Sequence, residues 1–167
     1  MPTVESKRIV IDTSLAISAA ILPKSISKKE FSLTLKQFQL VSSDSTLAEL
    51  IDVIYRAKFE KYLTDEMRLE LLTVVAQATE LIKIRSAIKD CPDPKDNQFL
   101  ELAIDGKASL ILSGDPHLID MNSYRNISIL GPVIIMVSGL MGSLLFPRFR
   151  RVSSDKVSTL EIYLPLV

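Results

Sequence analysis

Four acidic residues stand where a predicted strand ends or a predicted helix begins. Asp12 ends the first apolar run of the chain, and Asp115 follows the apolar run at residues 108–112 after a Ser-Gly turn. Glu49 and Asp96 each fall in the first turn of a predicted helix. Open parallel sheets bind ligands beyond the carboxyl ends of their strands. We therefore expect the four carboxylates to converge on one crevice.

Carboxylates that converge repel one another unless a cation is shared between them. Oxygen ligands suit Mg²⁺ or Mn²⁺, which keep bound waters that a substrate phosphate can displace. Such a metal lowers the pKa of a bound water and neutralises charge on a leaving oxygen. The expected chemistry is metal-assisted phosphodiester hydrolysis, with Asp12 as the central ligand. The other three acids would complete the metal sphere and orient the attacking water.

Each acid also has a structural interpretation that the sequence leaves open. Glu49 could complete a capping box with Thr46, and Asp96 could be a first-turn acid favoured by the helix dipole. Asp12 and Asp115 each precede a segment that they could cap as a helix.

The surrounding sequence alternates between short apolar strands and helices. A strand at residues 8–12 leads into a helix at 13–21, and an amphipathic stretch at 31–38 precedes a second apolar run. Residues 42–46 offer N-caps for a helix ending at Ile54, and Thr64 caps another that runs to Ala78. This alternation predicts an α/β fold with a parallel sheet of four or five strands, flanked by helices.

The second half of the chain continues the pattern. Asp93 is predicted to cap a helix that begins at Pro94 and ends at Gly106. A strand at 108–112, a short helix after Pro116 and a last strand at 127–130 follow.

Composition excludes several classes of protein. Apolar residues make up 47% of the 167, and 20 Lys and Arg balance 20 Asp and Glu, so neither a disordered chain nor a polycation is expected. The single cysteine excludes an intramolecular disulfide and a cysteine zinc cluster. Asp12 and Ser14 interrupt the first apolar run, which argues against a secretory signal. We expect a cytoplasmic protein.

Four segments occur in a characteristic order: IDTS at 11–14, STLAEL at 45–50 with RAKF at 56–59, DPKDNQFLELA at 93–103 and SGDPHL at 113–118. Together they resemble the PIN (PilT N-terminal) domain family, and within it the VapC-like toxins. The resemblance covers residues 7–132, which we predict to form one PIN-like nuclease domain with a three-layer fold.

This resemblance implies a Mg²⁺- or Mn²⁺-dependent endoribonuclease, the toxin of a type II toxin–antitoxin pair. It implies an RNA substrate, a cognate antitoxin that blocks the site, and a homodimer. The metal-binding quartet would be Asp12, Glu49, Asp96 and Asp115. An alternative is a catalytically weak or inactive PIN-like module that binds a protein.

Three further residues would support the quartet. Ser14 matches the small polar residue that supports the first acid of the family, and Asp93 caps the segment that carries Asp96. His117 stands where the family usually carries another acid, which lowers the charge of the site by one. Arg56 and Lys58 follow the helix of Glu49, and they are either phosphate contacts or a solvated helix face.

The mean hydropathy of the chain is +0.26, and its longest apolar run lies near the C-terminus. The twenty residues from Ile127 to Phe146 carry no charge, which is the length of a membrane span. The predicted strand at 127–130 and Gly131-Pro132 interrupt that run, so we favour a non-membrane interpretation and leave a membrane association open. Residues 133–167 form an apolar and then basic tail, which we leave unassigned.

Overall fold

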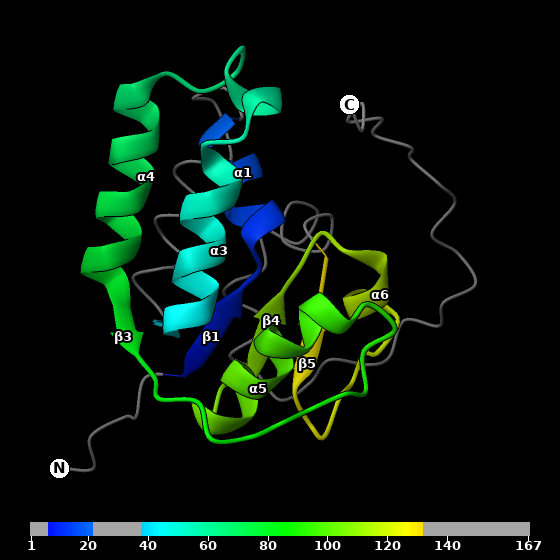
Figure 1. Cartoon of the computed structure of the whole chain (residues 1–167). Coiled ribbons are helices and arrows are strands. Elements are labelled where there is room, and N and C mark those ends of the chain that lie inside the picture. The colour runs from blue at the N-terminus through cyan, green and yellow to red at the C-terminus, as the bar shows by residue number, and fades with distance from the viewer. Residues whose placement is uncertain (1–6, 22–37, 132–167) are drawn as a thin grey trace, which may run out of the picture.

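The computed structural model describes residues 7–21 and 38–131 (Figure 1). Their sheet has five strands, all parallel, in the order β3-β2-β1-β4-β5. The strands are β1 (Arg8–Ile11), β2 (Gln39–Ser42), β3 (Thr79–Leu81), β4 (Leu110–Leu112) and β5 (Ser128–Leu130). The predicted α/β architecture with a parallel sheet is confirmed, and the number of strands is five.

Helices connect the strands, as parallel pairing requires. The α-helices are α1 (Thr13–Ile21), α3 (Asp44–Ile54), α4 (Asp65–Ala78), α5 (Asn97–Asp105) and α6 (Pro116–Ile119). There are also two 3₁₀ turns, η1 (Ala57–Phe59) before α4 and η2 (Pro94–Asp96) before α5. Figure 1 shows α3 and α4 as a pair, with α5 and α6 gathered near β4 and β5.

Alternation along the strands divides the core into two halves, because successive strand side chains point to opposite faces. Ile9 of β1 packs with side chains of α1, α3 and α4, whereas its neighbour Val10 packs with those of α5 and α6. Ile111 of β4 lies in the same half of the core as Val10, and Leu112 lies with Ile9. The sheet is therefore the middle of three layers.

Helix ends follow the local signals in most places. Thr64 caps α4 by accepting from the Met67 amide, as predicted. The segment after Asp93 differs in one respect, because the 3₁₀ turn η2 precedes α5 and the α-helix itself begins only at Asn97. Gly106 ends α5 as expected, and a Cβ there would lie 2.7 Å from the Leu102 carbonyl oxygen.

Some predictions concern residues outside the described ranges. The amphipathic stretch at 31–38 lies outside them except for Phe38, which is buried. The apolar tail that begins at residue 133 also lies outside them. Among the helices that the structure describes, none combines the length and the apolar character that crossing a membrane requires.

Candidate metal centre

Asp12 follows the central strand β1 and is almost fully buried. Its Oδ1 accepts from the Leu15 amide at 2.7 Å and from the Ser14 hydroxyl at 3.1 Å. Its Oδ2 accepts from the Gly114 amide at 3.1 Å and from the Ser113 hydroxyl. Burial raises the pKa of the Asp12 carboxyl, and these donors oppose that rise because they favour the charged form. The carboxylate therefore both caps α1 and is fixed in orientation by α1 on one side and by the turn after β4 on the other.

Glu49 is free of the capping role that the sequence left open for it. The capping box of α3 is made by Ser43 and Thr46 instead, since each side chain bonds the backbone amide of the other. The Glu49 carboxylate accepts hydrogen bonds from the Gln98 amide group of α5 and from Thr13. Burial raises its pKa, and the Asp12 charge adds to the rise.

Asp96 is a partly buried carboxyl with other acids around it. Burial, followed by repulsion from Asp115, Asp93, Asp12 and Glu49, raises its pKa to about 6. All four of those acids therefore lie close enough to Asp96 to disfavour its charge. Its Oδ2 is also buried, with no hydrogen-bond partner among the described residues. A buried acceptor that lacks a donor calls for a ligand.

Asp115 is partly engaged in a structural role. Its Oδ1 accepts from the His117 amide at 2.8 Å and so caps α6, as its structural interpretation suggested. The same oxygen lies 3.3 Å from Nδ1 of His117. Its backbone amide donates to the Ser113 hydroxyl at 2.9 Å, which ties Asp115 to the group that also holds Asp12.

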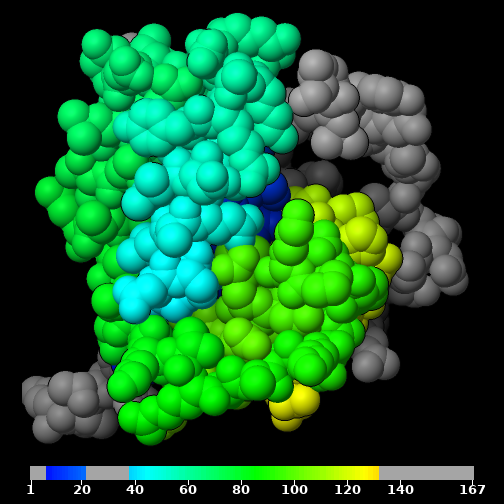
Figure 2. Space-filling view, in the orientation of Figure 1, coloured from blue at the N-terminus to red at the C-terminus, as the bar shows by residue number. Residues whose placement is uncertain are grey.

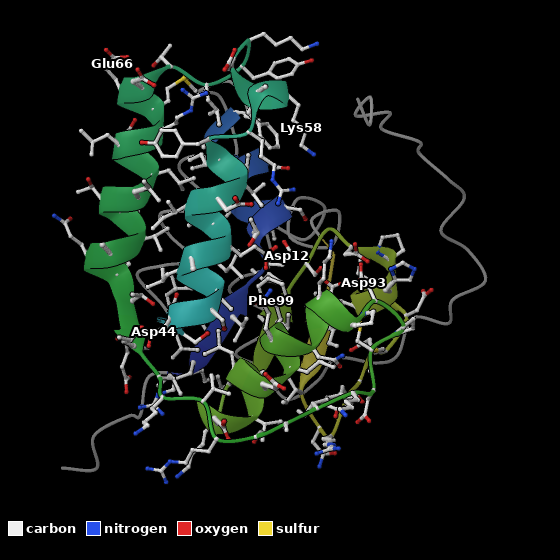
Figure 3. The ribbon with its side chains drawn as sticks, in the orientation of Figure 1. Asp12, Asp44, Lys58, Glu66, Asp93 and Phe99 are labelled. Carbon is white, nitrogen blue, oxygen red and sulfur yellow. The ribbon has the colours of Figure 1, made fainter. Side chains whose placement is uncertain are left out.

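Asp93 and His117 lie beside Asp96. The potential ligand atoms of these three side chains are all within 4.8 Å of one another. Figure 3 shows Asp12 between α3 and the region of α5 and α6, with Asp93 near α6. In Figure 2, atoms of the blue segment that contains β1 and α1 lie in a recess between the cyan atoms of α3 and the green atoms of α5.

The two predicted phosphate contacts differ in their surroundings. Arg56 is half exposed and pairs with Asp52 at 2.6 Å, yet its charge still opposes the rise in the pKa of Glu49. Lys58, in η1, lies 5.0 Å from the centre of the Phe59 ring. Arg56 is thus near the acidic group, although it already has an acidic partner.

Three residues near the carboxylates were not assigned a role from the sequence. Ser113 binds Asp12, and Gln98 and Thr13 bind Glu49. Ser113 follows β4, which pairs with β1, so its position one residue beyond a strand was a usable signal. Gln98 carried no such signal, because its contact depends on how α5 packs near α3.

This arrangement fits a divalent cation by its own chemistry. Four other carboxylates act electrostatically on Asp96, which offers a buried oxygen with no donor in the part of the chain that the structure describes. A hard cation would relieve the repulsion and satisfy that oxygen. The predicted ligands are Asp12, Glu49, Asp96 and Asp115, and of these Asp96 has two further potential ligands, Asp93 and His117, beside it.

Comparison with known proteins identifies the class to which this fold and site belong. The model of the PIN domain family matches residues 8–117, and the chain belongs to that family. A relative, the uncharacterized protein MJ1680 of Methanocaldococcus jannaschii, is 35% identical over 127 residues, which cover 72% of this chain and 81% of the relative.

A solved structure shares the fold. It is the crystal structure of VapBC2 from Rickettsia felis bound to a DNA fragment from the promoter of the pair. The similarity covers 74% of this chain and 98% of the matched chain, with a TM-score of 0.50 and 16% identity. The three-layer PIN-like fold predicted from the four sequence segments is thereby confirmed.

Proposed function

We propose that this protein is a divalent-metal-dependent endoribonuclease that serves as the toxin of a type II toxin–antitoxin pair. The observation that carries the proposal is the gathering of four other carboxylates around Asp96, whose buried Oδ2 has no hydrogen-bond partner among the described residues. Membership of the PIN domain family supports the same conclusion. Carboxylates that repel one another cost stability, a cation bound between them removes that cost, and acids perturbed in this way are common at active sites.

A bound Mg²⁺ or Mn²⁺ would supply an activated water and neutralise charge on the leaving oxygen of an RNA phosphodiester. Asp12, Glu49, Asp96 and Asp115 would hold the cation. The Ser113 hydroxyl and the Gly114 amide orient the carboxylate of Asp12. Gln98 orients that of Glu49, so that neither group must reorganise during the reaction.

Arg56 and Lys58 are the proposed contacts to the RNA backbone. The chain has no net charge, so binding would rest on a few local cations beside the acidic group. Such binding should weaken steeply as salt rises, because each phosphate contact releases counterions.

The partner we propose is a cognate antitoxin that covers the site, in a homodimer of this chain. The solved VapBC2 structure that shares this fold supports the idea, since it holds two partners of such a pair. A small gene for a DNA-binding protein beside this one would support it further.

The test is cleavage of structured and unstructured RNA by the purified protein with Mg²⁺ or Mn²⁺. We expect Asp12→Asn to lower the cleavage rate by about a hundredfold or more, because the central ligand is lost. Asp44→Asn is the matched control, since this exposed acid lies apart from Asp12 in Figure 3 and should leave the rate unchanged. Intact RNA with the wild-type protein, no different from Asp12→Asn, would refute the nuclease and favour a protein-binding module.

A further inference from the structure

We propose that Asn97 is a positioning residue for the candidate metal centre. Its buried side chain fixes the turn that carries Asp93 and Asp96, so that Asp96 stays close to the other acids before a cation binds. The role rests on the proposed function only in that the quartet holds a cation. It requires neither a second ion nor cleavage of RNA.

Asn97 is the first residue of α5, and only 7% of it is exposed. Its Oδ1 accepts from the Cys91 amide at 2.9 Å, and its Nδ2 donates to the Pro94 carbonyl oxygen at 3.2 Å. One side chain therefore bonds the backbone on both sides of Asp93. Asp96 directly precedes Asn97 in the chain, so the same bonds restrain its position.

Asparagine suits this position by its chemistry. A backbone amide needs an acceptor and a carbonyl oxygen needs a donor, and a carboxamide carries both on the same carbon. Aspartate would turn an oxygen toward the Pro94 carbonyl, and alanine would leave the buried Cys91 amide without its acceptor. Both bonds therefore depend on the carboxamide of Asn97.

Repulsion among the acids gives these bonds a consequence for the metal centre. Four other carboxylates disfavour the charge of Asp96, which is only partly buried. Movement of the turn toward solvent would separate the charges and lower their repulsion. The turn η2 has only three residues, and the Asp96 side chain forms no capping bond to α5. The bonds of Asn97 oppose that movement, because they would have to break before the turn could leave α5.

A second attachment lies at Asp90, immediately before Cys91. Asp90 Oδ2 accepts from the Tyr124 hydroxyl at 2.5 Å and from Nη2 of Arg125 at 3.1 Å. Tyr124 is buried in the same half of the core as Cys91. The bonds of Asn97 thus act on a segment whose other end is already held.

A fixed turn affects how tightly the cation binds. Ligands that are held in place before binding lose little conformational freedom when the cation arrives, so less binding free energy is lost to ordering them. Residues that orient metal ligands without binding the metal contribute about tenfold or more to affinity.

Calorimetric titration of the full chain with Mn²⁺ tests the role. Asn97→Ala should weaken Mn²⁺ binding about tenfold. Asn122→Ala is the matched control, because Asn122 Oδ1 also accepts from a backbone amide, that of Ile129 at 2.8 Å, but fixes β5 instead of the turn. The control should bind Mn²⁺ as the wild type does. Wild-type affinity in Asn97→Ala would overturn the proposal, and so would an equal loss in both variants.

Urea unfolding separates positioning from general destabilisation. Ile111→Ala removes a fully buried side chain of β4, so it should lower the urea midpoint more than Asn97→Ala does and still bind Mn²⁺ as the wild type does. Affinities that follow the urea midpoints across the variants would overturn the proposal.

A milder variant covers the case in which Asn97→Ala does not fold. Asn97→Ser keeps a polar group, but its side chain is too short to span both Cys91 and Pro94. It should bind Mn²⁺ more weakly than the wild type, and wild-type affinity in this variant would overturn the proposal.

The Mn²⁺ dependence of RNA cleavage gives a further readout. Asn97→Ala should raise the Mn²⁺ concentration for half-maximal rate about tenfold and change the rate at saturating Mn²⁺ by less than about twofold, because every ligand is still present. Asp12→Asn should instead lower the saturated rate. A lower saturated rate in Asn97→Ala, with an unchanged half-maximal Mn²⁺ concentration, would overturn the positioning role.

The nuclease and the role of Asn97 fail separately, because the calorimetry contains no RNA. A protein that cleaves no RNA but loses Mn²⁺ affinity in Asn97→Ala keeps the positioning role and loses the nuclease. Cleavage of RNA together with wild-type Mn²⁺ affinity in Asn97→Ala keeps the nuclease and overturns the positioning role. A wild-type chain that binds no Mn²⁺ overturns both.

Discussion

At the scale of single residues, repulsion among the carboxylates around Asp96 is unfavourable for the folded protein. Asp12 offsets its burial with hydrogen bonds to both carboxylate oxygens. Asp96 has no such compensation within the described ranges, because no residue there donates to its Oδ2 and its neighbours are acids. Sites of this kind commonly trade stability for function.

Asp96→Asn should therefore stabilise the metal-free protein. The native carboxyl has a pKa of about 6, above its ordinary value of 3.8, so its ionisation opposes folding at pH 7 and above. We expect a gain of about 1 kcal/mol at pH 7.5, reduced from the full electrostatic cost because the residue is only partly buried. Urea unfolding with a chelator present measures the change.

The gain should shrink as the pH falls through 6 and vanish below about pH 4, where the wild-type carboxyl is protonated in both states. Asp44→Asn, at an exposed position, removes the same charge and should show no such gain. Equal effects of the two variants at pH 7.5 would mean that Asp96 is not strained by its neighbours.

At the scale of elements, the segment between β3 and α5 is long and has no regular structure before η2. Side chains of α5 hold its middle part, and Asp90 near its end accepts from the Tyr124 hydroxyl at 2.5 Å. Asp105, at the end of α5, accepts from the amides of Arg85 and Ser86 at 2.6 and 2.8 Å and from the Ser86 hydroxyl. Glu101, one turn earlier, accepts from the Ile88 amide. These bonds determine where the chain enters the candidate metal centre.

Asp105→Ala should destabilise the protein by about 1 to 2 kcal/mol at pH 7, because two amides and a hydroxyl lose a charged acceptor. The amides lower the pKa of Asp105, so its contribution is present at neutral pH. It should be lost as the pH falls below about 4 and through that lowered pKa. Urea unfolding at pH 7 and pH 3 measures both effects, and Asp120→Ala is the control. An equal loss at both pH values would contradict this role.

At the scale of the whole molecule, stability depends on the burial of both faces of the sheet. β1 and β4 are interior strands, and their residues supply alternate halves of the core. The edge strand β3 contributes less, and Leu81 at its end remains 57% exposed.

Ile111→Ala should accordingly lower the free energy of unfolding by about 3 kcal/mol, since Ile111 is fully buried in β4. Leu81→Ala should cost less than about 0.5 kcal/mol, because most of its side chain is already in water. Chemical denaturation compares the two variants. Similar losses would mean that the edge strand is as important as the centre.

The sequence by itself determined the local features of this protein. The caps at Thr64, Asp93 and Asp115 depend on residues two or three positions away, and all three form. Apolar runs and helix starts depend on equally short separations, so the order of strands and helices was predictable apart from the three-residue strand β3, which the sequence did not predict. The same apolar runs and helix starts put the four acids near strand ends, which is why the acids could be proposed as one group.

Tertiary structure alone decided the contacts between residues that are far apart in the sequence. The hydrogen bonds from Gln98 to Glu49 and from Ser113 to Asp12 join residues 49 and 101 positions apart. The proximity of His117 to Asp93 and Asp96 also needs α6 to lie beside η2. Such contacts follow from the strand order and from how helices pack on the two faces of the sheet. Packing depends on the shapes of many side chains at once, and no local pattern encodes it.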